Sequence, residues 1–455
     1  MASSPNSPAG TPLIRGIGLL QATALNVNNM IGIGPFITLP LIVASMGGPQ
    51  AMLCYIVGAI VAVCDGQVWA ELASRLPESG GTYRFLRVCY GDRWGLLMSF
   101  LFIWQVSFQG PLSFAGGCIG FANYMAYLVP MHGVWAKIAP MLVAVFVVFL
   151  LYRRITVIGK LATVFAAGAV LALLMTIAAG FANFHWSLLT DLPADAFSMT
   201  TKFWLGLGDA TRRGIYTFLG YYNVCFIGDE VKDPTKTIPR AILAAVGIVT
   251  VLYLALNSAI LGSMPWRQII PGQGADTRYL AATIAERAFG KTAATVLVML
   301  ILWAAIASLF ALMLANSRVL YAAARDGEYF SFFARVHPAD KFPYVSLLAL
   351  GAVAAAFTLL SLDTVITSLV VIRSTVQFMG QNVGLYLLRR NRPDLPMPFR
   401  MWLYPIPGII ALAGWLFIFF TARQFILLGG GFLLTGVAAF LIHQRSRDGW
   451  PFAKA

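Results

Sequence analysis

Long apolar stretches recur along the entire chain, and most of them are separated by short polar loops. Because a membrane-spanning helix needs about 20 mainly apolar residues, this pattern predicts an all-α polytopic membrane protein. The stretches number twelve, at residues 16–46, 49–75, 94–128, 132–152, 160–183, 201–228, 241–263, 292–322, 343–361, 364–388, 402–422 and 424–443. We predict one transmembrane helix for each, with polar tails at residues 1–15 and 444–455.

The first apolar stretch contains a pattern that does not favour a continuous helix. Residues 32–36 read Gly-Ile-Gly-Pro-Phe. Pro35 fits best as the first residue of a new helix, and the two glycines give the chain conformational freedom just before it. We predict two half-helices joined by an unwound segment; a simple kink is the alternative. Unwound backbone at this depth lines a cavity or is covered by protein, and the amides that begin the second half-helix suit a carboxylate.

A second interruption is predicted in the sixth stretch, where aromatic and β-branched residues surround the single glycine Gly220. The first and sixth spans occupy equivalent positions in two five-helix halves, and an odd number of helices gives the halves opposite orientations. Interrupted helices at corresponding positions are typical of inverted-repeat transporters. We therefore predict a five-plus-five inverted repeat over residues 16–390, discontinuous in helices 1 and 6 (LeuT-like). Helices 11 and 12 occupy residues 391–443.

Composition supports one membrane domain. Of the 455 residues, 59% are hydrophobic and only 11% are charged, which is less charge than soluble domains carry. The longest outer connection, residues 264–290, contains a helix-like piece at residues 279–288. Residues 1–15 lack the pattern of a cleaved signal peptide, so we expect the first helix to be retained.

The net charge of +14 does not call for a nucleic acid partner. If the chain is threaded from a cytoplasmic N-terminus, inner loops receive most basic residues, such as Arg240 and Arg389, and outer loops receive few, such as Arg267. This positive-inside bias predicts an integral protein of the cell (inner) membrane with both termini cytoplasmic. The sequence has no Asn-x-Ser/Thr sequon, which favours a bacterial membrane. A homodimer stays open.

The sequence offers no pattern of enzyme chemistry. Its five cysteines and four histidines lack metal-ligand spacing, and we find no phosphate loop or nucleophile–base pair. We expect no enzymatic activity, no cofactor and no metal site.

Four motifs, in order, resemble the amino acid–polyamine–organocation (APC) family of transporters, of the bacterial amino acid permease or antiporter type. They are the break at residues 32–36, residues 71–83 (ELASRLPESGGTY), residues 228–241 (beginning GDEVKDP) and residues 317–327 (SRVLYAAARDG). The resemblance implies alternating access and an amino acid substrate held between the breaks of helices 1 and 6.

The resemblance also implies a set of site residues. The substrate carboxylate would meet amides at the first break, the ammonium would meet carbonyls of both breaks, and Tyr216 falls where the family places an aromatic lid. Three positions of the third helix fall where related antiporters place side-chain contacts, and Phe218 is a further candidate for the pocket wall. The candidate substrate-binding residues are Met30, Gly32, Ile33, Gly34, Gln105, Gly110, Ser113, Tyr216, Phe218, Leu219 and Gly220.

Two positions depart from the family pattern. Ile33 replaces the usual serine, which removes a hydroxyl but keeps the backbone amide. Ala169 stands where many relatives carry a lysine that substitutes for sodium. We expect this space to be empty, as in some exchangers; a sodium site with help from Ser308 is the alternative.

Several charged residues lie where charge is expensive. Asp65 and Arg373 are the most deeply placed; they are interpreted as a gating or proton-linked pair or, as we favour, a fixed structural bridge. Arg212 and Arg213, one turn before Tyr216, either act on the substrate at the outer vestibule or extend to the headgroups. Near the inner end of the sixth span, salt bridges of a cytoplasmic gate are the expected role of Asp229 and Glu230.

We expect a secondary active transporter of amino acids, exchange or proton-linked, with neutral α-amino acids favoured. The preference rests on the absence of an acidic residue from the pocket positions named above, since a dicationic substrate needs counter-charges. Uptake of polyamines or cationic amino acids is the alternative. From another class, a non-transporting sensor or a channel on the same scaffold remains open.

Overall fold

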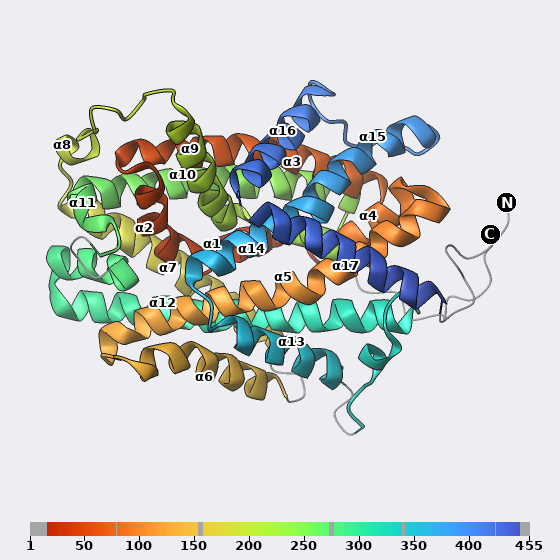
Figure 1. Ribbon diagram of the computed structural model, residues 1–455, viewed down its shortest axis with the longest axis horizontal. Coiled ribbons are helices and arrows are strands. Elements are labelled where there is room, and N and C mark those ends of the chain that lie inside the picture. Colours follow the sequence, from red (N-terminus) through yellow and green to blue (C-terminus); the bar gives the residue numbers. More distant parts are fainter. Residues whose placement is uncertain are drawn as a thin grey trace.

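The computed structural model is an almost entirely helical bundle (Figure 1). It describes residues 16–78, 80–152, 158–272, 277–338, 342–423 and 425–445, and for residues 158–167 it describes the backbone alone. The predicted N-terminal tail and all but two residues of the predicted C-terminal tail lie outside these ranges. Within them no β-strand forms, and Ile17 and Val231 make an isolated bridge. The all-α prediction is confirmed.

The helices follow the predicted apolar stretches closely. Their bounds are α1 Leu19–Ile31, α2 Gly34–Met46, η1 Pro49–Met52, α3 Leu53–Arg75, α4 Thr82–Cys89, α5 Gly91–Leu128, α6 Val134–Leu151, α7 Ile158–Ala182, α8 Trp186–Leu189, α9 Thr201–Phe218, η2 Asn223–Glu230, α10 Pro234–Ser263, α11 Trp266–Ile269, η3 Thr277–Tyr279, α12 Leu280–Arg325, η4 Ser331–Ala334, α13 Tyr344–Phe357, α14 Leu362–Arg373, η5 Ser374–Gly380, α15 Gln381–Asn391, α16 Ile406–Thr421 and α17 Phe425–Arg445.

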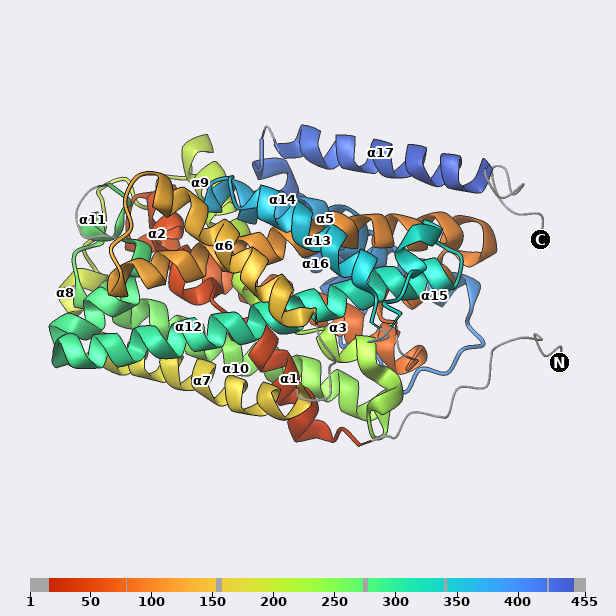
Figure 2. The same ribbon diagram turned by 90° about the horizontal axis from the view of Figure 1, so that it is seen from below.

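Seven helices of the described chain are long and apolar enough to cross a membrane, and the bent pair α1–α2 makes an eighth. Shorter apolar helices cover residues 168–182, 344–357 and 406–421. The long helices run along one axis of the bundle, with α5 and α12 crossing its length, while α17 lies along an outer edge (Figure 2). This architecture is that of a polytopic membrane protein.

Both predicted interruptions are present. Helix α1 ends at Ile31, and α2 begins at Gly34 with Pro35 in its first turn, so that the two half-helices meet at an angle of 47°. Helix α9 ends at Phe218, residues 219–222 are not helical, and the 3₁₀-helix η2 follows. Gly220 has φ +127°, a conformation that residues with a side chain rarely adopt.

Two further irregularities were not predicted. Helix α12 contains a break at Gly290 (φ +82°), so the helix-like outer piece joins the eighth predicted stretch directly. In the tenth predicted stretch, α14 passes into the π-helix η5 directly after Arg373 and then into α15. A π-helical stretch shifts the directions in which side chains project and is frequent at functional sites.

Candidate functional site

The two helix breaks lie against each other. A Cβ atom on Gly220 would lie only 3.0 Å from the backbone carbonyl carbon of Asn29, so a side chain has no room where the second break crosses α1. The Tyr253 hydroxyl, on α10, lies between the breaks, 2.7 Å from the carbonyl oxygen of Met30 and 3.0 Å from that of Thr217. One buried hydroxyl therefore contacts both interrupted helices.

The inner half-helices are also tied together. The Asn26 side chain on α1 accepts a hydrogen bond from the Val224 amide of η2, at 3.0 Å. Before α1, the amides of Gly16 and Ile17 donate to the Glu230 carbonyl, and Lys232 donates back to Ile17. These contacts fix α1 and η2 as a pair on one side of the breaks.

Backbone donors are available at the first break. Within the described chain, the amides of Ile33 and Gly34 donate no hydrogen bond, whereas the Phe36 amide already donates to the Ile33 carbonyl at 3.1 Å. Both amides precede the first closed turn of α2, where the positive end of the helix dipole lies. This arrangement stabilises an anionic group such as a carboxylate.

A cavity of about 370 Å³ lies beside the two breaks, a size typical of small-molecule sites. Ten of the candidate residues from the sequence line it, counting the ion-site and charge candidates: Met30, Gly32, Ile33, Gly34, Ser113, Tyr216, Leu219, Gly220, Ser308 and Arg373. Among the described lining residues, Arg373 is the one charged side chain. The cavity thus joins both breaks with faces of α5, α12 and α14.

Three candidates of the substrate set do not line the cavity. Gln105 is fully buried, and its amide bonds Gln377, which does line the cavity, at 3.0 Å. Gly110 allows close packing, since a Cβ there would lie 3.0 Å from Asn316. Phe218 is buried edge-to-face against Tyr253, with ring centroids 5.4 Å apart. These three residues pack behind the residues that line the cavity.

The lid candidate Tyr216 lies over the start of α2. Its ring approaches within 3.3 Å of where a Cβ of Gly34 would be, so the glycine lets the ring reach the first break. The Ile33 side chain instead points at α5, where its Cδ1 atom lies 3.0 Å from the Cβ position of Gly120. The Ile33 side chain therefore packs against α5 at Gly120.

Asp65 and Arg373 do not form the predicted ion pair in the described chain. Asp65 on α3 is 1% exposed and accepts hydrogen bonds from Tyr221 at 2.6 Å, Asn382 at 2.8 Å and Trp415 at 3.1 Å. Tyr221 belongs to the second break. The interpretation as a fixed bridge between these two charges is corrected: Asp65 anchors the second break to α15 and α16 through neutral donors.

Comparison with known proteins shows the family of the chain. The profile of a family described as "Amino acid permease" matches residues 17–442. The chain belongs to the amino acid permease family. It is 28% identical over 460 residues to an uncharacterized transporter of Mycobacterium tuberculosis, with 98% of this chain and 96% of the relative covered.

Among the relatives that carry substrate names are two amino acid transporters. The permease is 27% identical over 443 residues to the mouse Asc-type amino acid transporter 1, covering 94% of this chain and 80% of the relative. It is 23% identical over 406 residues to the serine/threonine exchanger SteT of Bacillus subtilis, covering 88% of this chain and 90% of the relative. The family and its members are membrane transporters, not enzymes.

On the side of the breaks formed by α2 and α9, two arginines of the permease hold helices together. Arg212 pairs with Asp209 at 2.8 Å and reaches Thr367 of α14, at 3.3 Å. Arg213 pairs with Asp363, at 2.7 Å, and donates to Ser45 of α2, at 2.6 Å. Neither lines the cavity. Arg212 and Asp209 are three residues apart on one helix, so their side chains lie on the same face and can pair.

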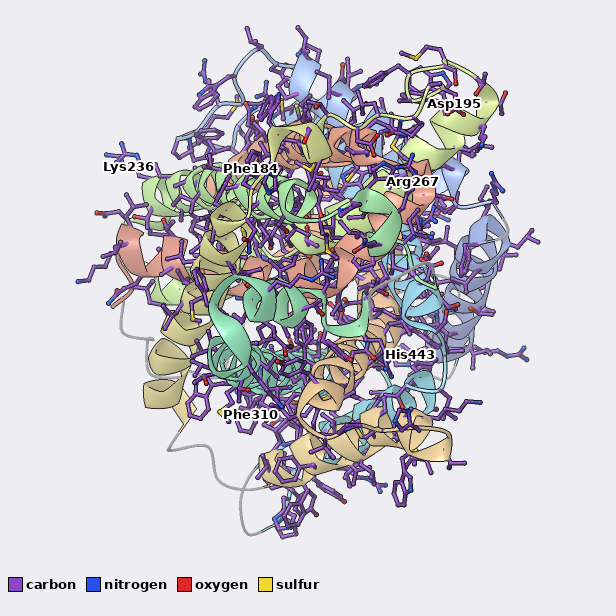
Figure 3. All side chains as sticks on the ribbon, turned by 90° about the vertical axis from the view of Figure 1, so that its left-hand side faces the viewer. Phe184, Asp195, Lys236, Arg267, Phe310 and His443 are labelled. Atoms are coloured by element: carbon purple, nitrogen blue, oxygen red, sulfur yellow. The ribbon has the colours of Figure 1, made fainter. Side chains whose placement is uncertain are left out.

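The loops of this end lie around the labelled Arg267 and Asp195 in Figure 3. Arg267 donates to Asp191 at 2.9 Å and lies 4.4 Å from the ring centroid of Trp266. At the other end, Glu230 acts through its backbone carbonyl in the bridge to residues 16–17. Neither Asp229 nor Glu230 lines the cavity.

The ion-site candidate Ser308 of α12 faces the first break, with its hydroxyl 3.4 Å from the Cβ position of Gly32. Ala169 is 3% exposed on α7. No group of three or more His, Cys, Asp or Glu side chains suited to a metal ion occurs in the described part of the permease.

Sequence reasoning missed three polar residues of the site. Tyr253 joins the breaks, and Gln377 and Asn316 line the cavity. All three lie on helices without an unusual local pattern, so only the tertiary arrangement reveals them. Gln109 is different, because its spacing of four residues from Gln105 on one helix face predicts a hydrogen-bonding role; it lines the cavity and bonds Asn316 at 3.4 Å.

Proposed function

We propose that this permease is a secondary active transporter that moves amino acids by alternating access, through exchange or proton-linked transport. The observation that carries the proposal is a single cavity bordered by two helix breaks, one of which presents unengaged amides. Unwound backbone inside a membrane protein occurs where it lines such a cavity. Twelve transmembrane helices in a five-plus-five inverted repeat, with interrupted helices 1 and 6, account for this arrangement.

The proposed substrate is an α-amino acid, with neutral ones favoured. Its carboxylate is bound by the amides of Ile33 and Gly34, and its ammonium by carbonyls of the breaks near Met30 and Leu219. Tyr216 closes over it. Support comes from the relatives that are named as amino acid transporters. Polyamines and cationic amino acids are disfavoured, because the described lining carries a cation and no Asp or Glu.

We also propose that the cavity faces the cytoplasm. Much of its lining comes from α1, η2 and the adjoining parts of α5 and α12, for example Leu25, Asn223 and Val319. On the opposite side, the contacts of Arg213 with Asp363 and Ser45 join α2, α9 and α14. The protein then lies in the cell (inner) membrane with cytoplasmic termini, and the other state opens on the α2–α9 side.

Uptake of labelled amino acids by proteoliposomes tests the proposal. The panel contains neutral, acidic and cationic amino acids, polyamines and amino alcohols that lack the carboxylate. Each is measured with and without internal amino acid, a sodium gradient and a pH gradient. We expect uptake of α-amino acids, at least tenfold weaker for the matching amino alcohols, and stimulation by internal substrate or by the pH gradient.

Several outcomes contradict the proposal or a part of it. Failure of every amino acid and amine to move or bind would end the transporter proposal, whereas binding without movement would indicate a non-transporting sensor. Saturation-free ion currents without uptake would indicate a channel. Amino alcohols transported as well as amino acids would refute the carboxylate site at the first break while leaving transport itself intact.

A further inference from the structure

Arg373 holds an unusual place at the cavity. It is the last residue of α14 and is followed directly by the π-helix η5. It lines the cavity together with Tyr222 and Gln377, and Gln377 is held from behind by Gln105. The side chain therefore projects from a locally widened helix toward the same space that the two breaks border.

The charge of Arg373 is not balanced by a carboxylate in the described chain. It forms no ion pair there, and its Nε atom is buried without a hydrogen-bond partner. Asp65 forms no ion pair with Arg373, and its oxygens accept bonds from Tyr221, Asn382 and Trp415 instead. The guanidinium carbon lies 5.9 Å from the ring centroid of Tyr222, at the outer limit of a cation–π contact.

An ionised group at membrane depth needs a partner or water and is typical of substrate pathways. The remaining described lining groups are neutral. A negatively charged solute in the cavity could therefore supply the counter-charge of Arg373. We propose that Arg373 sets the charge selectivity of the cavity: it pairs with a carboxylate on the substrate side chain and rejects a cationic side chain. Acidic amino acids therefore join neutral ones as substrates.

This inference rests on the proposed function and names its side-chain class. An acidic amino acid carries two carboxylates. One meets the amides of the first break, and the other meets the guanidinium, whose planar fork matches a carboxylate. A neutral side chain leaves Arg373 with water. A cationic side chain brings two like charges together in surroundings where screening is weak.

Competition in proteoliposomes tests the inference. The probe is whichever labelled neutral amino acid the wild type takes up best, and unlabelled glutamate, aspartate, lysine and agmatine compete with it. In wild type, we expect the acidic competitors to inhibit at concentrations at least tenfold lower than the cationic ones. Arg373→Gln should reduce this ratio at least tenfold, and Arg373→Lys should keep part of it, because lysine retains the positive charge but not the planar fork.

Arg318→Gln is the matched control. Arg318 is also a half-buried helix arginine with no ion pair in the described chain, but it donates to the Leu314 carbonyl, at 2.8 Å, and does not line the cavity. Its substitution should leave the ratio within twofold of wild type. Thermal-shift binding of glutamate and lysine to purified variants gives the same ratio for a variant too slow to transport.

The outcomes are distinguishable. A wild type that takes up neutral amino acids, with an unchanged ratio in Arg373→Gln, overturns the inference and leaves the proposed function standing. Equal loss for every competitor in Arg373→Gln also overturns it, because Arg373 then merely anchors Tyr222. A wild type that takes up no amino acid overturns the proposed function itself.

Discussion

The two helix breaks differ in what they offer a substrate. At the first, two glycines and a proline expose the amides of Ile33 and Gly34, which donate no hydrogen bond in the described chain, at the start of a regular α-helix. The second is built from aromatic residues around Gly220 and continues into a 3₁₀-helix, and its Tyr221 is bonded to Asp65. One break is open for recognition, whereas the other is fastened to the surrounding helices.

This difference suggests a division of labour. The first break presents donors backed by a helix end, so it suits the part of the substrate that is common to all amino acids. The second break connects the surrounding helices. It touches Asn29 of α1, and Tyr253 and Asp65 contact it from other helices. Substitutions at the second break should therefore affect all substrates, and those at the first should depend on the carboxylate.

The largest effect is expected from Gly220→Ala. The new Cβ would lie 3.0 Å from the Asn29 backbone, in a conformation with φ +127°, which costs about 1–3 kcal/mol for a residue with a side chain. Uptake of every substrate should fall at least tenfold in proteoliposomes. Gly247→Ala is the control: its Cβ meets no atom within 4 Å, and uptake should stay within twofold of wild type. Near-normal uptake by Gly220→Ala would mean that the breaks need not touch.

The two breaks also differ in how far sequence alone predicts them. Glycine and proline act through local backbone geometry, so residues 32–36 announce the first break directly. Gly220 alone is a weak signal, and the second break was predicted from its equivalent position in a repeat. The structure places both breaks within a residue or two of their predicted positions. The twelve apolar stretches were readable for a similar reason, since hydropathy depends on composition.

Side-chain partners were harder to predict. Sequence paired Asp65 with Arg373 because both are charged and deep, yet Asp65 bonds neutral donors that come from three different segments. Gln105 was assigned to the pocket, but Gln377 stands in front of it. The π-helix η5 depends on backbone hydrogen-bond register rather than on composition. Such features arise when helices meet, and no local pattern records them.

A second prediction tests whether the hydrogen bonds of Tyr253 to both interrupted helices matter, apart from the packing of its ring. Tyr253→Phe removes the hydroxyl that contacts the carbonyls of Met30 and Thr217, leaving buried acceptors unpaired at a cost of about 1–3 kcal/mol. Uptake should fall roughly tenfold for all substrates, and the melting temperature of the purified protein should drop.

The control for this prediction lies beside it. The Tyr55 ring centroid is 6.4 Å from that of Tyr253, and its buried hydroxyl has no hydrogen-bond partner in the described chain. Tyr55→Phe removes the same atom without breaking a bond, so stability and uptake should be equal to or slightly above wild type. Equal losses in both variants would show that the hydroxyl of Tyr253 has no special role.

A smaller effect is expected where the inner half-helices meet. Asn26→Ala removes the acceptor of the Val224 amide, and loss of one buried hydrogen bond lowers stability by about 1 kcal/mol. Because α1 and η2 remain bridged through Gly16, Ile17 and Glu230, uptake should fall only a few-fold. Hydrogen exchange of η2 amides should rise in Asn26→Ala; unchanged exchange would show that the bond does not hold the pair.

The smallest effect is expected at the first break itself, from Ile33→Val. The Ile33 side chain packs against α5 at Gly120, so losing one methylene lowers stability by about 0.5–1.5 kcal/mol. The backbone amide that we propose to bind the carboxylate is unchanged. Apparent affinity for amino acids, and their advantage over the matching amino alcohols, should therefore stay within twofold of wild type. A large loss of this advantage would show that the side chain helps to read the carboxylate, and that the first break does not work through its backbone alone.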